Sequence, residues 1–286
     1  MKHRKTLQEL TIKDNFMFGA VMCDEQNCKR FLEIALGFPI AKVEVTKEKC
    51  IVYHPQYKGV RLDVYAKDDK KTYYNVEMQA VKKPALFRRA RYYHSQIDME
   101  LLLSGTSYSE LPNSYVIFVC DFDPFGKQKY CYTIQNQCLE LGNKIVNDGN
   151  ITIFLSTKGK NREEVPKELI KFLEYVSADL KDSTENFDDE FVASIQSSVE
   201  SIKRSREMES RYMIFKEMLQ DERREGKEEG KLEAMAESIV AFLEEIDTPT
   251  EELCKKIMEE TDYVIMKRWL KLAVKAESIE QFMSEM

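Results

Sequence analysis

The stretch "RLDVYAKDDKKTYYNVEMQ", residues 61–79, decides the fold because it has the pattern of a β-hairpin. Two runs of alternating apolar and polar side chains flank the segment "KDDKK", whose composition is typical of a turn. With the turn centred on Lys70, antiparallel pairing places Asp63 opposite Glu77, and Gln79 lies one residue pair further along the same face. The other face is apolar and consists of Leu62, Val64, Ala66, Tyr74, Val76 and Met78.

The polar face of this hairpin has two interpretations. Two carboxylates that face each other on neighbouring strands repel one another. A divalent cation such as Mg2+, with Mn2+ as a substitute, would offset the repulsion if Asp63 and Glu77 were its ligands, and it could activate a water molecule. Gln79 could then orient that water or a phosphate group. The alternative is an ordinary polar hairpin face whose carboxylates pair with Arg61 and Lys67, and the residues alone leave both interpretations open.

The segment before the hairpin predicts a pair of helices. In "NFMFGAVMCDEQNCKRFLEIALG", residues 15–37, the apolar residues recur at near-helical spacing, and the pattern stops at Gly37 and Pro39. Asp14 stands directly before this segment, where a helix N-cap is expected. A cap is therefore favoured for Asp14 over a catalytic carboxylate.

The segments around the hairpin predict the rest of a sheet. "AKVEVTKEKCIVY" (41–53) alternates like a strand and is followed by the turn composition "HPQYKG" (54–59). "ALFRRARYYHSQIDMELLLSG" (85–105) is an amphipathic helix, whereas "SYVIFVCDF" (114–122) is almost continuously apolar, as a central strand is. "KYCYTIQN" (129–136) and "NITIFLST" (150–157) add further strands. The fold class is therefore α/β (α+β), a mixed sheet flanked by helices.

Beyond Pro166 the sequence predicts helices only. We expect a first domain over residues 1–180, a charged helical linker with coiled-coil character over 181–245, and a small helical module over 246–286. Gly226 and Gly230, the two glycines of this part, each weaken a helix and so predict a hinge.

Charge restricts the partners that the chain can bind. The net charge of −7 disfavours a protein that coats nucleic acid indiscriminately. A local basic surface is still compatible with it, and "KKPALFRRARYYH" (82–94) is the candidate. Its basic residues are Lys82, Lys83, Arg88, Arg89 and Arg91. The alternative for this segment is a solvated helix start.

The cysteine and histidine content argues against several kinds of catalytic site. The seven cysteines are scattered without a CxxC pair, and the chain has three histidines and no GxSxG motif. Catalysis is therefore expected to rest on carboxylates. No window approaches the roughly 18 apolar residues of a membrane span, so we expect a cytoplasmic protein with no membrane partner.

Several segments closely resemble the Rpn family of recombination-promoting nucleases, also called PD-(D/E)xK nuclease family transposases. They are "GVRLDVYAKDDKKTYYNVEMQ", "RRARYYHSQID" and "LPNSYVIFVCDFDPFG", with "TIKDNFMFGAVM", "CKRFLEIALG" and "DGNITIFLSTKG" fitting the same pattern. The resemblance covers roughly the first 180 residues. It implies a mixed sheet with flanking helices.

The resemblance also implies a function and a set of site residues. Asp63 and Glu77 match the metal-binding aspartate and glutamate of the motif, and Gln79 falls on the position of its lysine, an ExQ form known in this family. Asp14 and Gln96 match an acidic residue of the first helix and a polar residue of the helix after the motif strand. For both, a functional and a structural role stay open.

The expected activity is that of a Mg2+-dependent DNA endonuclease linked to recombination or to mobile-element or defence biology. Because Gln79 lacks the positive charge of a lysine, the alternative is a catalytically silent nuclease-fold protein that binds DNA or a protein partner. A homodimer that forms through the C-terminal helices is a further expectation.

Overall fold

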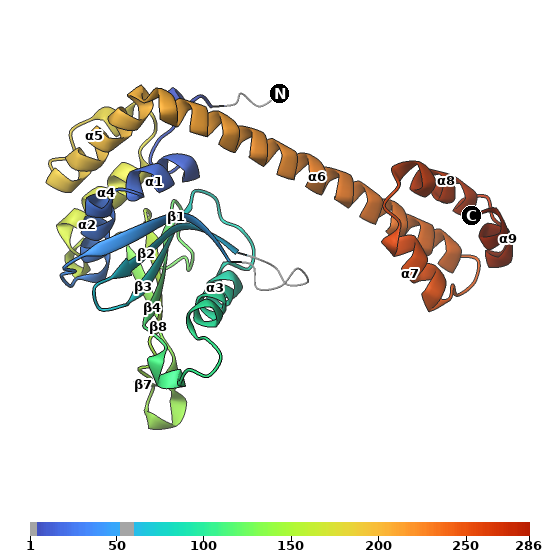
Figure 1. The fold of residues 1–286 in the computed structure, drawn as a ribbon, viewed down its shortest axis with the longest axis horizontal. Helices are drawn as coiled ribbons and strands as arrows, with labels where there is room; N and C mark the ends of the chain where they lie inside the picture. The colour runs from blue at the N-terminus through green and yellow to red at the C-terminus, as the bar shows by residue number, and fades with distance from the viewer. Residues whose placement is uncertain (1–4, 52–59) are drawn as a thin grey trace. The chain divides into compact units, whose positions relative to one another are not determined.

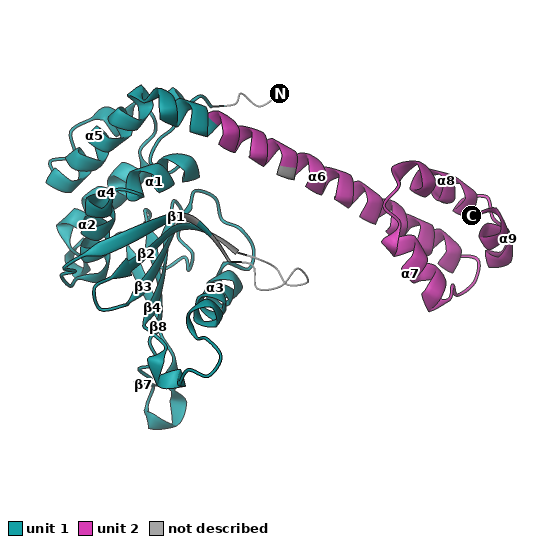
Figure 2. Cartoon of the chain, viewed as in Figure 1, with its two compact units in different colours: residues 1–212 teal, residues 213–286 magenta. Residues whose placement is uncertain are grey.

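The computed structural model describes residues 5–51 and 60–286 of the chain (Figure 1). The predicted turn at residues 54–59 lies outside the described residues. The chain divides into two compact units, Met1–Tyr212 and Met213–Met286 (Figure 2). The first unit contains the sheet, and the second is helical.

A mixed six-stranded sheet forms the centre of the first unit, in the order β1-β2-β3-β4-β8-β5 (Figure 1). Its strands are β1 (Val43–Ile51), β2 (Val60–Asp68), β3 (Tyr73–Gln79), β4 (Ser114–Cys120), β5 (Cys131–Ile134) and β8 (Asn150–Ser156). β3, β4 and β8 run parallel, whereas the pairs β1–β2, β2–β3 and β5–β8 are antiparallel. Two short strands, β6 (Gln137–Cys138) and β7 (Lys144–Ile145), form a separate ribbon. The predicted mixed α/β architecture is confirmed.

The hairpin of β2 and β3 has the predicted register. Val64 pairs with Val76, and Lys67 pairs with Tyr73. Asp68 stabilises the turn, because its Oδ1 accepts hydrogen bonds from the backbone N–H groups of Lys70 and Thr72, at 2.9 Å and 2.8 Å. The aspartate-rich turn composition thus has a direct structural cause.

Helices cover both faces of the sheet. α1 (Asn15–Met22), α2 (Glu25–Leu36) and α4 (Lys167–Ser177) cover one face, and α3 (Leu86–Leu101) covers the other (Figure 1). α5 (Glu190–Arg204) packs on α1, α2 and α4. The predicted pair over 15–37 is α1 and α2. α2 begins where Asp24 caps the N–H groups of Gln26 and Asn27, and it ends at Gly37, whose φ of 76° is left-handed.

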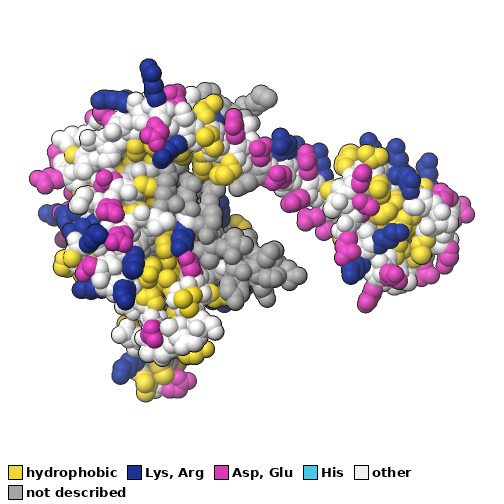
Figure 3. Space-filling view, in the orientation of Figure 1, with side chains coloured by type: hydrophobic (Ala, Val, Ile, Leu, Met, Phe, Trp, Pro, Cys, Tyr) yellow, Lys and Arg dark blue, Asp and Glu magenta, His cyan; other side chains and the backbone are white. Residues whose placement is uncertain are grey.

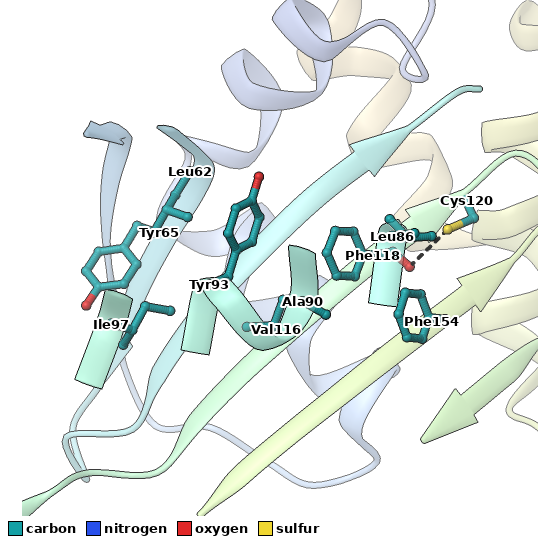
Figure 4. Close-up of a cluster of buried hydrophobic side chains, with 10 residues drawn as sticks. All are labelled: Leu62, Tyr65, Leu86, Ala90, Tyr93, Ile97, Val116, Phe118, Cys120 and Phe154. Carbon is teal, nitrogen blue, oxygen red and sulfur yellow. Dashed lines mark hydrogen bonds between the residues drawn. The ribbon is translucent and has the colours of Figure 1, made fainter. Parts of the chain in front are cut away.

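α3 packs on the sheet through the residues that its periodicity predicted. Leu86, Ala90, Tyr93 and Ile97 lie in one buried cluster with side chains of β2, β4 and β8 (Figure 4). Phe118 of β4 stacks on Phe154 of β8, with ring centroids 5.1 Å apart. This cluster fixes the helix above β3 and β4, and therefore above the odd-numbered residues of β3.

The second unit is a helical bundle. α6 (Arg206–Glu244) begins in the first unit, and its C-terminal part packs with α7 (Glu251–Glu259), α8 (Tyr263–Ala273) and α9 (Ile279–Glu285) around Trp269. α6 runs without a break through Gly226 and Gly230, and side chains of both charges cover its surface (Figure 3). No helix within residues 5–51 and 60–286 combines the length and the apolar character that a membrane crossing requires.

The expected domain boundaries at residues 180 and 245 fall inside the two units. α5 belongs to the first unit because its apolar residues are buried there, and Phe191 contacts Phe172 at a ring distance of 5.6 Å. Tyr212 ends this unit, and its hydroxyl donates a hydrogen bond to the Lys5 carbonyl at 3.0 Å. At the other end of the expected linker, Leu243 lies in the core of the second unit.

Candidate metal centre

The N-terminal half of β2 and the C-terminal half of β3 bring two carboxyl groups together. The backbone N–H of Asp63 donates a hydrogen bond to Glu77 Oε1 at 3.2 Å. In the opposite direction, the backbone N–H of Met78 donates to Asp63 Oδ2 at 3.4 Å. The β2–β3 pairs end at Val64 and Val76, and beyond them each carboxyl group accepts a hydrogen bond from the backbone of the other strand.

Burial and charge make Glu77 an unusual carboxyl group. Its side chain is 3% exposed. Burial and the charge of Asp63 raise the pKa of Glu77 to about 8, although the N–H of Asp63 and the charge of Arg89 act in the opposite direction. At neutral pH, Glu77 therefore favours either a proton or a cation that takes its place.

The donor atoms fit a hard divalent ion. Asp63 and Glu77 offer oxygen ligands, and within the described part of the chain no third acidic, histidine or cysteine side chain joins them in a metal-binding group. Mg2+ is commonly bound by one or two carboxylates and keeps several water molecules. The charged form of Glu77 is disfavoured by burial and by the Asp63 carboxylate, and a bound divalent ion would stabilise that charged form.

Gln79 lies on the same face as Glu77, two residues further along β3, and is 5% exposed. Its Nε2 donates a hydrogen bond to the carbonyl of Met78 at 2.9 Å. This bond uses one N–H of the amide, so the amide oxygen and the second N–H are the groups that Gln79 can offer to a water molecule.

Asp14 and Gln96 do not join this pair. Asp14 accepts hydrogen bonds from Lys5 Nζ at 2.8 Å and from the backbone N–H of Thr11 at 2.8 Å. It stands at the N-cap position of α1 but makes no side-chain cap bond, so the expected cap is corrected to an ion pair and a turn contact. Gln96 is buried on α3, and no hydrogen bond between described residues connects it to Asp63 or Glu77.

The basic segment divides into outward and inward residues. Lys82, Lys83, Arg88 and Arg91 are exposed. Arg89 instead turns inward, and its guanidinium lies 5.3 Å from the ring centroid of Phe118 and 5.7 Å from that of Tyr93. The prediction of one basic surface therefore applies to four of the five residues, because the sheet-facing side of α3 includes position 89.

Three residues near the pair were missed by sequence reasoning. Asn15 Nδ2 donates to Asp63 Oδ2 at 3.5 Å. Burial and the charge of Glu77 raise the pKa of Tyr93, which places its hydroxyl near that carboxyl group. Asn75 is fully buried two residues before Glu77 on β3, and its side-chain amide lowers the pKa of Glu77. Only Asn75 could have been found from the sequence, because the alternation of side chains along a strand places it on the same face as Glu77.

Comparison with known proteins gives one match. The model of the PD-(D/E)XK nuclease family transposases matches residues 13–229, which include the sheet, α3 and both carboxyl groups. A comparison with curated proteins found no match, and neither did a comparison with solved structures.

Proposed function

The chain belongs to the PD-(D/E)XK nuclease family transposases, and on that premise we propose that it is a Mg2+-dependent endonuclease that hydrolyses phosphodiester bonds of DNA. The observation that carries this proposal is the hydrogen-bonded pair of Asp63 and buried Glu77 on adjacent antiparallel strands. Two such carboxyl groups are a costly arrangement for a purely structural hairpin, and a bound divalent ion would remove that cost.

Each residue has a separate part in the proposed reaction. Asp63 and Glu77 hold the ion, which when bound supplies a more acidic water and offsets negative charge on the phosphate. Gln79, with its nitrogen engaged by Met78, positions the attacking water through its amide oxygen. Asn15 orients the Asp63 carboxylate through its amide nitrogen.

The exposed basic residues at the start of α3 are the proposed DNA contact. Lys82, Lys83, Arg88 and Arg91 would bind backbone phosphates, which positions a duplex without reading its sequence. The acidic net charge does not oppose this. Residues 213–286 contain 19 acidic and 11 basic side chains, whereas residues 1–212 contain 31 acidic and 32 basic side chains. The nuclease unit is thus nearly neutral.

A plasmid-nicking assay on the full chain tests the proposal. With Mg2+ or Mn2+ we expect wild-type protein to convert supercoiled plasmid to nicked or linear forms, and EDTA to stop it. Asp63→Ala and Glu77→Ala should each lower the rate by at least about a hundredfold. Asp69→Ala, which removes an exposed carboxylate from the turn of the same hairpin, should leave the rate unchanged. Inactive wild type, or Asp63 and Glu77 variants as active as wild type, would overturn the proposal.

A second candidate function is favoured by Gln79 itself. An amide supplies no positive charge, and here its nitrogen is engaged by the backbone. A silent nuclease-fold protein would bind DNA or a partner with the same surface, and its DNA affinity would survive Glu77→Ala while no cutting occurred. For either function we propose a cytoplasmic protein that acts in recombination, mobile-element or defence processes.

A further inference from the structure

Arg89 is a partly buried cation, and two of its guanidinium nitrogens make no hydrogen bond within the described structure. Its Nε and Nη2 atoms are buried and have no acceptor. The contacts of its guanidinium are instead with the rings of Phe118 and Tyr93, at 5.3 Å and 5.7 Å (Figure 4 shows both rings). Buried N–H groups without an acceptor cost free energy, so an acceptor from outside the chain that reaches these two nitrogens would stabilise the side chain.

The location of Arg89 connects it with the carboxyl pair. Phe118 is the direct neighbour of Glu77 on β4, and Cys120 is the neighbour of Gln79. The charge of Arg89 lowers the pKa of both Glu77 and Cys120 against the raising effect of burial. The guanidinium lies 5.3 Å from the Phe118 ring, on the β4 side of Glu77, whereas Asp63 lies on the β2 side.

A purely structural role explains these contacts poorly. An arginine kept to neutralise a carboxylate would form a close ion pair with it, but Glu77 accepts its hydrogen bond from the backbone of Asp63. An arginine kept only for packing on aromatic rings would leave its nitrogens in water. A phosphate group suits a guanidinium with free N–H groups, because its oxygens accept two parallel hydrogen bonds.

We propose that Arg89 binds a non-bridging oxygen of the reacting phosphate and supplies, from α3, the positive charge that Gln79 does not supply from β3. The inference rests on the proposed function, since it assigns the same site a phosphodiester substrate. It separates Arg89 from Arg88 and Arg91, whose exposed side chains contact phosphates along the backbone of the DNA. Arg89 would act together with the metal on one phosphate.

DNA-binding measurements on the full chain test these separate roles of Arg89 and Arg88. They are made once with Ca2+, which holds the phosphate without cutting, and once with EDTA. In wild type, Ca2+ should tighten DNA binding. Arg89→Gln should reduce this Ca2+-dependent gain about tenfold, whereas Arg88→Gln should weaken binding equally in Ca2+ and in EDTA. Arg204→Gln, which removes an exposed arginine of α5, should change neither. With Mg2+, Arg89→Gln should lower kcat about a hundredfold, and Arg89→Lys should recover part of that loss.

Thermal unfolding in EDTA distinguishes the substrate role from a structural one. Because Nε and Nη2 of Arg89 have no acceptor among residues 5–51 and 60–286, Arg89→Gln should leave Tm unchanged or raise it. A lower Tm together with equal losses of binding in Ca2+ and EDTA would overturn the proposal. If Arg89→Gln loses Ca2+-dependent binding but wild type never cuts DNA, the result would contradict the endonuclease function and support the phosphate site. If wild type cuts DNA and Arg89→Gln cuts it equally well, the role of Arg89 is wrong but the endonuclease function stands. If wild type shows neither Ca2+-dependent binding nor cutting, both the role of Arg89 and the endonuclease function are wrong.

Discussion

At position 77, strand β3 buries a carboxyl group beside the carboxylate of Asp63. The pKa of Glu77 is raised from 4.5 to about 8, chiefly by burial. In the folded chain the group therefore holds its proton to higher pH than in the unfolded chain. This stabilisation is fully present below about pH 4.5 and is lost as the pH rises through about 8.

Glu77→Gln should remove this dependence. The amide has the size of the protonated acid and cannot ionise, so the variant should gain stability over wild type as the pH rises from about 5 to about 8. We expect the difference in the free energy of unfolding to grow by at least about 1 kcal/mol, the equivalent of roughly one pKa unit. Urea unfolding of both proteins in EDTA measures it.

The buried His94 does not affect the comparison of wild type with Glu77→Gln. Burial between Ser114 and Thr152 lowers the pKa of His94 to about 4, which gives the chain a second pH dependence. Both proteins contain His94, so its contribution cancels in the difference. Stability profiles of wild type and Glu77→Gln that stay parallel across this pH range would show that Glu77 is not held in the way the structure indicates.

Single residues were predicted from the sequence only where local geometry determines them. The period of a strand and the length of a turn predict Asp63 opposite Glu77, and the observed pairs from Val64–Val76 to Lys67–Tyr73 have the same register. Asn15 and Tyr93 reach the pair through tertiary packing of α1 and α3, which no spacing along the chain encodes. The hydrogen bonds of Asp14 with Lys5 and Thr11 were unpredictable for the same reason, because they depend on how the N-terminal segment folds.

At the scale of elements, the strands and helices were predictable because their apolar residues keep a clear period. The burial of Leu86, Ala90, Tyr93 and Ile97 follows from helical spacing alone. The order of the strands was not predictable, because β8 lies between β4 and β5 although β5 comes first in the chain. Such pairing depends on contacts between distant segments.

The basic segment illustrates the same limit within one helix. Composition located five cations near the start of α3, yet only the docking of the helix on the sheet decides which of them face inward. Arg89 lies three residues after Leu86 and four before Tyr93, which are both buried against the sheet, so it shares their face of α3 and turns toward β4. The sequence located a basic surface, and packing separated Arg89 from it.

At the scale of the whole molecule, charge is distributed unevenly along the chain. The acidic excess lies in residues 213–286, and the unit that contains the carboxyl pair is nearly neutral. Within α6, apolar side chains are exposed at Met213, Ile214, Met218 and Leu219. Exposed apolar residues on a charged helix are typical of a surface that packs against another helix.

Sedimentation of the full chain and of a chain that ends at Tyr212 tests the proposed homodimer. If a second copy covers the apolar residues of α6, the full chain should sediment as a dimer and the shorter chain as a monomer. Ile214→Glu with Met218→Glu in the full chain should also weaken the dimer. A shorter chain that remains fully dimeric would place the contact in the first unit instead.

The location of a bound metal ion tests the central claim most directly. Crystals of the full chain soaked in Mn2+ can be measured at the manganese absorption edge, where anomalous scattering identifies the ion. We predict an anomalous peak between the carboxylates of Asp63 and Glu77, and its loss in the Asp63→Asn variant. Well-ordered carboxylates without a peak between them, in crystals that bind Mn2+ elsewhere, would contradict the proposed metal centre.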